Sequence, residues 1–390
     1  MRSLVTGSSG LLGRCLTSLL RARGDELRLF DLVPPETDQT PTSPFEKGGS
    51  RGIHSNDSES KSPLPPLFQR GERSNSPRDG SPDDFICADM RDAVRVEEAA
   101  RGVDVIYHLA AAQRMKPQFS ALKEKEIYEM NLQGVANVLN AAERTGVGKV
   151  VFVSSSGIYG VPRTLPCTED HPTQPLGAYG YSKLEAEGLC RQAISRGLNV
   201  TVLRPMSIFG PGMTGVFAIL FDWVYNDRPV YLLGRGKNRL QFVSAWDLGE
   251  ACMQAARTPK SSGGFYNIGA DPATVVTSYE QVRALIDHAG SSSTIIRVPN
   301  TLLRSAARGL HAIGLSPIVP EHYLLADANF VLDVSRAKAD LEWQPRHSNV
   351  ELMNAAYDWY AEHVETHRPK PHPILKLLDA AARLRPSRGH

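Results

Sequence analysis

A tyrosine and a lysine lie four residues apart at the start of a predicted helix over residues 179–196. At this spacing two side chains share one face of a helix, so the Lys183 ammonium is expected to lie beside the Tyr179 phenol and lower its pKa. A phenol with a lowered pKa can act as an acid or a base. A run of serines, residues 154–156, ends a predicted buried strand over residues 149–154 and offers hydroxyl groups for the same chemistry. These residues predict proton transfer, although a Tyr-x-x-x-Lys spacing also arises by chance on surface helices.

A glycine-rich turn, TGSSGLLG at residues 6–13, follows a predicted strand and opens a predicted helix. Gly7 permits a tight turn, Gly10 lets the backbone approach a pyrophosphate, and Gly13 allows close helix packing. The helix N-terminus offers free N–H groups to the phosphates. This context predicts a dinucleotide site, and a glycine turn without a ligand is the alternative. The residues expected to contact the dinucleotide here are Gly7, Ser9, Gly10, Leu11 and Gly13.

Two acidic residues stand at the ends of later strands, and the first of them, Asp31, favours NAD as the dinucleotide. Asp31 ends the second predicted strand, where a carboxylate accepts hydrogen bonds from both ribose hydroxyls and repels a 2′-phosphate. Asp89, with Met90 beside it, is expected near the adenine. The alternatives are that Asp31 begins the turn before Pro34 and that Asp89 caps the next helix.

The elements that must position these residues alternate between short apolar runs and helical patterns, as βαβ units require. Strands are predicted at residues 2–6, 27–31, 104–108, 149–154 and 199–203. Helices between them are predicted at residues 11–22, 92–101, 120–145 and 179–196. The fold class is therefore α/β, a Rossmann-type doubly wound parallel sheet with a smaller C-terminal substrate-binding region.

The 390 residues divide into three predicted parts. Residues 1–204 form the NAD-binding domain, interrupted at 34–84 by an insertion rich in Pro, Ser and Gly that is predicted to be disordered. Residues 205–367 form a mixed α/β substrate-binding region interleaved with the first domain, with helices near 215–227, 245–257 and 277–289. A tail over residues 368–390 contains a short amphipathic helix at 374–384.

Composition excludes several classes of function. The formal net charge is +2, and basic residues are scattered, so nucleic-acid binding is not expected. The five cysteines lie far apart without zinc-ligand spacing, which predicts a reduced compartment and no metal. No signal peptide or membrane span is recognised, so the cytoplasm is the expected location.

With these motifs in place, the sequence resembles the extended short-chain dehydrogenase/reductase superfamily, specifically its NAD-dependent epimerase/dehydratase family. The resemblance covers nearly the whole chain except the insertion. The motifs are TGSSGLLG at 6–13, HLAA at 108–111, Asn131 in NLQGVANVLNAAE, SSSGIYG at 154–160, YGYSK at 179–183, LRPMSIFGPG at 203–212, FYNIG at 265–269 and DVSRAKADLEWQP at 333–345.

The resemblance implies a role for several further residues. Ser155 is the implied catalytic hydroxyl, flanked by Ser154 and Ser156, with a register uncertain by one residue. Lys183 is implied to hold the nicotinamide ribose while Tyr179 exchanges a proton with the substrate and hydride passes to or from NAD. The further residues implied to line the cofactor are Leu109, Ala110, Ala111, Asn131 and Pro205, for which core packing or strand termination is the alternative role.

The substrate is less constrained by the sequence, and three functions remain open. A nucleotide-sugar epimerase or dehydratase is favoured by family frequency and by Arg235, Lys237 and Arg239 near the expected diphosphate. The segment GRGKNRLQF at 234–242 is more similar to the 3β-hydroxysteroid dehydrogenase branch, which favours a dehydrogenase or reductase of a sterol or β-keto substrate. A non-catalytic NAD-binding protein is the third alternative, and an intact Ser155, Tyr179 and Lys183 argue against it.

The resemblance also implies a partner. Family members commonly dimerise through two long helices, here 120–145 and 179–196, which form a four-helix bundle. The expected partners are a small-molecule substrate and a second copy of the chain.

Overall fold

The computed structural model describes residues 1–34, 83–113, 122–210, 213, 216–298 and 328–367. Within them, seven strands form one parallel sheet in the order β10-β6-β5-β4-β1-β2-β3. These strands are β1 (Arg2–Thr6), β2 (Glu26–Asp31), β3 (Asp84–Cys87), β4 (Val105–His108), β5 (Lys149–Val153), β6 (Val200–Pro205) and β10 (Phe265–Ile268). This order, in which the chain reverses direction across the sheet after β3, confirms the doubly wound Rossmann-type fold.

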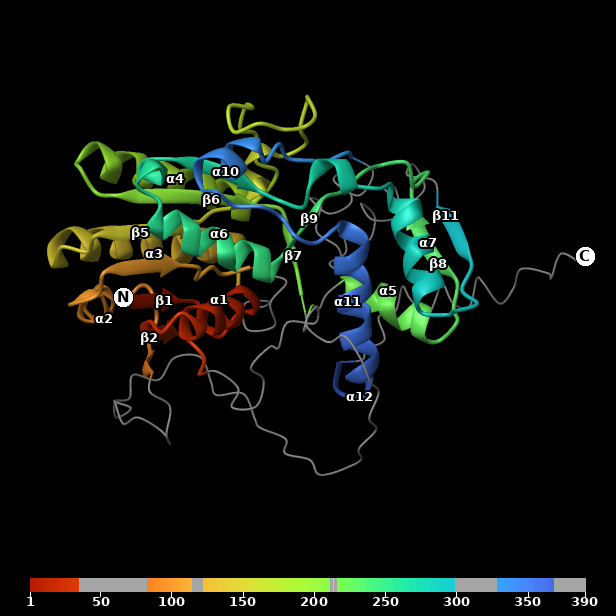
Figure 1. Ribbon diagram of the computed structural model, residues 1–390, viewed down its shortest axis with the longest axis horizontal. Helices are drawn as coiled ribbons and strands as arrows, with labels where there is room; N and C mark the ends of the chain where they lie inside the picture. The colour runs from red at the N-terminus through yellow and green to blue at the C-terminus, as the bar shows by residue number, and fades with distance from the viewer. Residues whose placement is uncertain (35–82, 114–121, 211–212, 214–215, 299–327, 368–390) are drawn as a thin grey trace, which may run out of the picture.

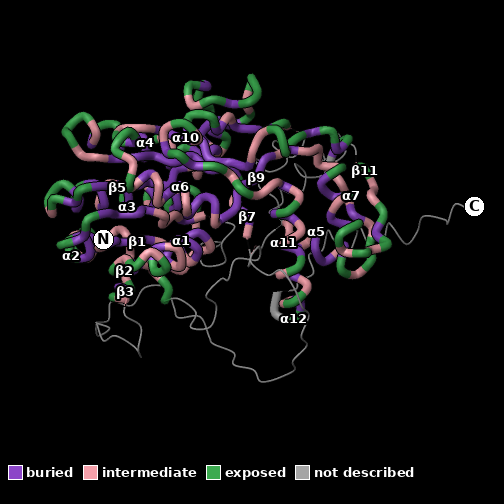
Figure 2. Tube along the Cα trace, viewed as in Figure 1, coloured by how far each residue is buried: buried purple, intermediate pink, exposed green. Residues whose placement is uncertain are grey.

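Apolar runs form the middle of the sheet because helices cover it on both faces. Every residue of β4 and β5 is buried. One face packs against α2 (Ala93–Ala100), α3 (Glu124–Thr145) and α4 (Ala178–Ser195), and the other against α1 (Leu11–Ala22) and α6 (Ala245–Arg257). Figures 1 and 2 show the resulting layers, with the buried backbone concentrated between the helices.

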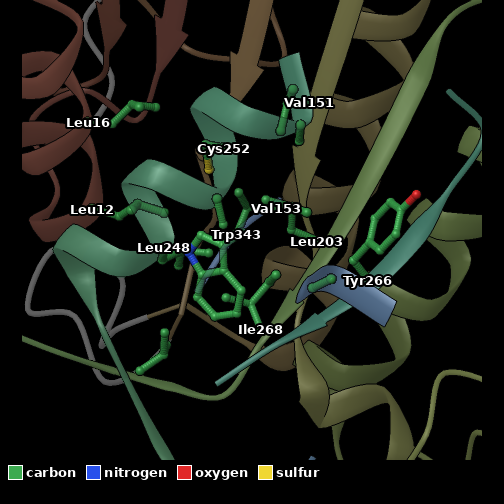
Figure 3. Packing of buried hydrophobic residues seen from close by; sticks show 14 of the residues in the cluster. Leu12, Leu16, Val151, Val153, Leu203, Leu248, Cys252, Tyr266, Ile268 and Trp343 are labelled. Atoms are coloured by element: carbon green, nitrogen blue, oxygen red, sulfur yellow. The ribbon is translucent and has the colours of Figure 1, made fainter. Parts of the chain in front are cut away.

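The C-terminal family signature is part of this core. Trp343, which follows α10 (Ser335–Asp340), is 2% exposed, and its indole Nε1 donates to the Asp247 carbonyl oxygen at 2.8 Å. Figure 3 shows the indole among Leu248 of α6, Val153 of β5 and Ile268 of β10. Burial of an indole with its N–H satisfied stabilises the fold and holds this segment against α6 and the main sheet.

A second group of elements lies to one side of the sheet in Figure 1. It packs around a separate apolar cluster that includes Phe221, Leu285 and Tyr360. Its elements are β7 (Ser207–Phe209), α5 (Val216–Tyr225), β8 (Val230–Leu233), β9 (Phe242–Ser244), α7 (Ser278–His288), β11 (Ile295–Val298), α11 (Asn349–Glu362) and α12 (Val364–His367). Between these segments the chain returns to the main sheet through α6 and β10. A domain boundary after residue 204 stays a prediction.

The insertion is shorter than predicted at its C-terminal side, because Asp84 begins β3 and pairs in register with Arg28. Most of the predicted insertion, residues 35–82, lies outside the described residues, as do the tail 368–390 and its helix 374–384. In the part of the chain that the structure describes, no helix is long and apolar enough to cross a membrane. The same residues contain no group of three or more metal-ligating side chains suited to a metal ion.

Candidate active site

The predicted functional residues gather at one edge of the sheet. The carboxyl ends of parallel strands share an edge, and ligands of doubly wound folds bind there, where the strand order reverses. Here the reversal lies between β1 and β4. Gly7 follows β1, Asp31 ends β2, Ser154 and Ser155 follow β5, and Pro205 ends β6.

The glycine turn is packed too tightly for side chains at two positions. Gly7 has φ +73°, and a Cβ there would lie 2.7 Å from the Ala110 backbone nitrogen. A Cβ on Gly13 would lie 2.2 Å from the Gly7 carbonyl oxygen. The first turn of α1 thus sits directly on the turn that precedes it. This contact also places Ala110, with Leu109 and Ala111 on either side, against the predicted cofactor turn.

The N-terminus of α1 fits an anionic group. Gly10 is the N-cap and brings no side chain, and the first turn of the helix contains no acidic residue. Among the described residues, a Cβ on Gly10 would approach only the Gly7 oxygen, at 3.3 Å, so the space at this Cβ position is otherwise open. Open space over a helix N-terminus is the arrangement that binds pyrophosphate in dinucleotide folds.

Asp31 joins the glycine turn to the end of β2. Its carboxylate accepts hydrogen bonds from the backbone N–H of Ser9 at 2.9 Å and of Val33 at 3.3 Å. The Ser9 hydroxyl donates to the Val33 carbonyl oxygen at 2.7 Å. A carboxylate can accept about four hydrogen bonds, so Asp31 retains acceptor capacity for ribose hydroxyls.

Asp89 does not cap α2, because that role belongs to Asp92, whose side chain accepts from the Arg95 N–H. Asp89 instead pairs with the Arg91 guanidinium at 2.6 Å. Burial opposes its ionisation, but the hydrogen bonds from Arg91 prevail and lower the pKa of Asp89. Met90 packs against Gly134 of α3, so this turn is held against the helix behind it.

Ser155 and Tyr179 meet at the centre of the site. The Tyr179 hydroxyl shares a hydrogen bond with the Ser155 side chain, and Ser155 Oγ accepts from the Gly157 N–H at 3.0 Å. Ser154 points elsewhere and donates to Glu187 Oε1 at 2.8 Å. Ser156, 6% exposed, begins a short 3-10 helix over Ser156–Tyr159. The structure thus brings Ser155, among the serines, to the phenol.

The expected effect of Lys183 on the phenol is wrong for this structure. The Lys183 ammonium donates to the Val153 carbonyl oxygen at 2.8 Å and lies 4.8 Å from the Phe152 ring centre, against 5.9 Å from the Tyr179 ring centre. The pKa of Tyr179 is raised by burial, which hydrogen bonds with Gln113 and Ser155 offset only in part. Burial thus favours the neutral form of this phenol.

Asn131 connects two segments behind the candidate site. Its Oδ1 accepts from the Ala112 N–H at 2.7 Å, and its Nδ2 donates to the Ala112 carbonyl oxygen and to Ser182 Oγ, both at 3.1 Å. The side chain, 6% exposed, joins the segment after β4 to α4. These contacts fit a positioning role for Asn131, and its contact with the cofactor stays a prediction. Pro205 is buried at the end of β6, opposite Ile268 of β10.

A buried ion pair beneath the candidate catalytic residues was not predicted from the sequence. Arg204 and Glu187, 2% and 1% exposed, form two hydrogen bonds at 2.9 and 2.7 Å. Arg204 also donates to the Tyr159 hydroxyl at 2.8 Å. Glu187 lies four residues after Lys183, on the same helix face, and this spacing was the available signal. The pair joins α4, β5 and β6 beneath the site.

The predicted substrate cations lie farther along the chain, on the loop between β8 and β9. Arg235, Lys237 and Arg239 are all exposed there. Their loop is fixed by a hydrogen bond from the Tyr279 N–H to the Gly236 carbonyl oxygen at 3.0 Å and by one from the Arg239 N–H to Asn329 Oδ1 at 2.8 Å. Three exposed cations on an anchored loop can bind an anion.

Comparison with known proteins identifies the family to which the chain belongs. The model of the NAD dependent epimerase/dehydratase family matches residues 3–269. The uncharacterized protein y4nG of Sinorhizobium fredii is 32% identical over 98% of this chain and 87% of its own length. Isoform 1 of the 3beta-hydroxysteroid-dehydrogenase/decarboxylase of Arabidopsis thaliana is 27% identical over 67% of this chain and 63% of its own length.

A solved structure with the same fold is the UDP-glucose 4-epimerase of Thermotoga maritima with UDP-glucose. It superposes with a TM-score of 0.68 over 93% of this chain and 100% of its own, at 20% sequence identity.

Proposed function

Because the chain belongs to the NAD dependent epimerase/dehydratase family and is therefore an enzyme with NAD as its cofactor, we propose that it epimerises or dehydrates a nucleotide sugar, with Tyr179, Lys183 and Ser155 as its catalytic residues. The contact between the Tyr179 and Ser155 side chains carries the proposal. It puts a proton donor at the same sheet edge as the glycine turn and Asp31.

Bound NAD supplies the hydride acceptor and donor of this chemistry. The N-terminus of α1 binds the pyrophosphate, and Asp31 holds the adenine-side ribose. Tyr179 passes a proton to or from the substrate oxygen, and Ser155 donates a hydrogen bond that positions this oxygen. Lys183, one helical turn further along α4, holds the nicotinamide ribose.

The Gly13→Ala variant is expected to bind NAD about tenfold more weakly or worse. The added Cβ would lie 2.2 Å from the Gly7 carbonyl oxygen, so the turn must open and the N–H groups that face the pyrophosphate must move. Calorimetric titration with NAD measures the change. Gly188→Ala in α4 is the control, because a Cβ there meets nothing within 4 Å. Unchanged NAD affinity in Gly13→Ala would contradict the cofactor assignment of this turn.

The substrate assignment is tested at the β8–β9 loop. Replacement of Arg235, Lys237 and Arg239 by Gln is expected to weaken UDP-glucose binding about tenfold, because cations at this loop would pair with the diphosphate. Equilibrium titration at two salt concentrations measures it, since screening should reduce the wild-type affinity more than that of the variant.

The control replaces three exposed cations outside this loop by Gln. They are Arg101, which follows α2, and Lys125 and Arg144 of α3. If both triple variants bind UDP-glucose like the wild type, the loop does not hold the diphosphate.

A dehydrogenase or reductase of a sterol or β-keto substrate is the second candidate. The similarity to the Arabidopsis enzyme and the GRGKNRLQF segment at 234–242 favour it. A thermal-shift panel separates the two functions, because a ligand that binds only the native state raises its melting temperature. Stabilisation by a 3β-hydroxysteroid but not by UDP-glucose would replace the first candidate with the second.

We further propose that the enzyme is a cytoplasmic homodimer. The helices α3 and α4 pack side by side on one face of the sheet, and α4 carries Tyr181 with 51% of its surface exposed. Pairing these helices across two copies forms a four-helix bundle.

A further inference from the structure

The serine turn, residues 154–159, connects the end of β5 to the short 3-10 helix over Ser156–Tyr159. Within it, Ser155 Oγ accepts a hydrogen bond from the Gly157 N–H at 3.0 Å, so this hydroxyl caps the short helix. The two ends of the turn are buried, with Ser154 2% and Tyr159 0% exposed. The direction of the Ser155 hydroxyl therefore depends on how these two ends are held.

The first end of the serine turn is bonded to α4 and β6. The Ser154 hydroxyl donates to Glu187 Oε1 at 2.8 Å, and the Ser154 N–H donates to the Leu203 carbonyl oxygen at 2.7 Å. One residue earlier, the Lys183 ammonium donates to the Val153 carbonyl oxygen at 2.8 Å. Lys183 and Glu187 lie one helical turn apart and share a helix face. The helix that carries the candidate proton donor thus also fixes the start of the serine turn.

The other end of the serine turn is bonded to β6 and β10. The Tyr159 hydroxyl accepts a hydrogen bond from Arg204 Nη1 at 2.8 Å and donates one to Asn267 Oδ1 at 2.8 Å. Asn267 is 0% exposed, and its Nδ2 donates to the Cys167 carbonyl oxygen at 3.0 Å. A phenol has one proton to donate, so a donor and an acceptor partner together fix its direction. Tyr159 can move only by breaking buried bonds to two strands.

A single ion pair connects the two ends of the turn. The Arg204 guanidinium donates to the Glu187 carboxylate through Nε at 2.9 Å and Nη2 at 2.7 Å, and its Nη1 donates to the Tyr159 hydroxyl. The same carboxylate accepts from the Ser154 hydroxyl. Because a guanidinium is planar and its N–H groups point in fixed directions, the two bonds to the carboxylate also fix where Nη1 points. Four side chains thus form one continuous hydrogen-bonded chain from Ser154 to Tyr159, beneath Ser155.

We infer that these four residues are a positioning clamp, Ser154, Glu187, Arg204 and Tyr159, which holds the Ser155 hydroxyl in the direction that the substrate oxygen requires. The inference rests on the catalytic role of Ser155 in the proposed function. The clamp acts through Ser155 and exchanges no proton with the substrate. Such a role has consequences for the rate, because a displacement of about 1 Å in a catalytic group can slow a reaction about 100-fold.

The experiment removes one hydroxyl from each end of the clamp in the full-length protein. In Ser154→Ala and in Tyr159→Phe, exchange of the Gly157 amide proton is expected to be about tenfold faster or more, because the Ser155 hydroxyl that accepts from this N–H is no longer fixed. Exchange into deuterated water followed by NMR measures this rate. The measurement needs neither substrate nor cofactor.

Turnover gives a second readout that a merely structural role would not produce. Each variant is expected to lower kcat on UDP-glucose about 10- to 100-fold at unchanged NAD affinity. In a Ser155→Ala background the same two substitutions should lower kcat no further, because the clamp acts through the Ser155 hydroxyl. This double-mutant cycle separates positioning from general loss of structure, which would lower kcat by the same factor in both backgrounds.

Thr201→Val is the matched control, because it also removes a buried hydroxyl from this core. Thr201 lies on β6, is 0% exposed, and donates to the Ser261 carbonyl oxygen at 2.6 Å. The control is expected to leave both the Gly157 exchange rate and kcat close to the wild type.

Gly157 exchange at the wild-type rate in both clamp variants overturns the inference, and so does an equal loss of kcat with and without the Ser155 hydroxyl. The two variants act at opposite ends of the turn, so if one fails to fold the other decides. Failure of the proposed function has a different signature, since it would appear as turnover at the wild-type rate in Ser155→Ala alone. The exchange measurement tests the clamp in that case as well.

Discussion

The Tyr179→Phe variant is expected to lose about 10²- to 10⁴-fold in kcat, the usual contribution of a general acid or base, while it binds NAD as tightly as the wild type. The substitution keeps the ring next to Lys183 and removes only the hydroxyl that Ser155 and Gln113 contact. Hydride transfer from a substrate alcohol requires that its proton leave. Without the phenol, water or a poorly placed neighbour must take it.

Turnover of UDP-glucose followed by product analysis, together with a separate NAD titration, measures the two expected effects. Tyr181→Phe is the control, because this tyrosine lies two residues later on the same helix with its side chain 51% exposed. Loss of NAD affinity in parallel with kcat would indicate a structural defect. Turnover at the wild-type rate in Tyr179→Phe would remove the proton-transfer role and revive the non-catalytic alternative.

The elements that position the site were predictable from local pattern. β1 and α6 have the predicted bounds, and the run KVVFV of β5 has the pattern of a strand covered on both faces. The predicted insertion included Asp84, the first residue of β3. A strand of four residues carries little periodicity, and β3 is defined by its pairing with β2.

The contacts within the site were less predictable, because they join residues far apart in sequence. Asn131 had no sequence signal that separates a cofactor contact from its bonds to Ala112 and Ser182. The spacing of Tyr179 and Lys183 placed both on one helix face. It did not reveal that the Lys183 ammonium donates to the carbonyl oxygen of Val153 in β5.

A second large effect is expected at the ion pair beneath the site. Glu187→Ala should reduce the free energy of unfolding by about 3–5 kcal/mol, because it leaves the Arg204 guanidinium buried without its carboxylate. Burial alone would lower the pKa of Arg204, but the bonds with Glu187 and Tyr159 raise it, so this guanidinium stays charged in the fold. Urea unfolding followed by circular dichroism measures the loss.

Two comparisons separate the buried charge from simple loss of a side chain. Glu143→Ala breaks an exposed pair with Arg196 and should cost about 1 kcal/mol or less, because solvent already screens that pair. Glu187→Leu combined with Arg204→Met should recover much of the stability, since an apolar pair removes the uncompensated charge. Equal losses in Glu187→Ala and Glu143→Ala would contradict a buried pair. If the double variant is stable yet slow on UDP-glucose, the pair is required to keep Ser154 bonded to α4 and Ser155 turned toward Tyr179.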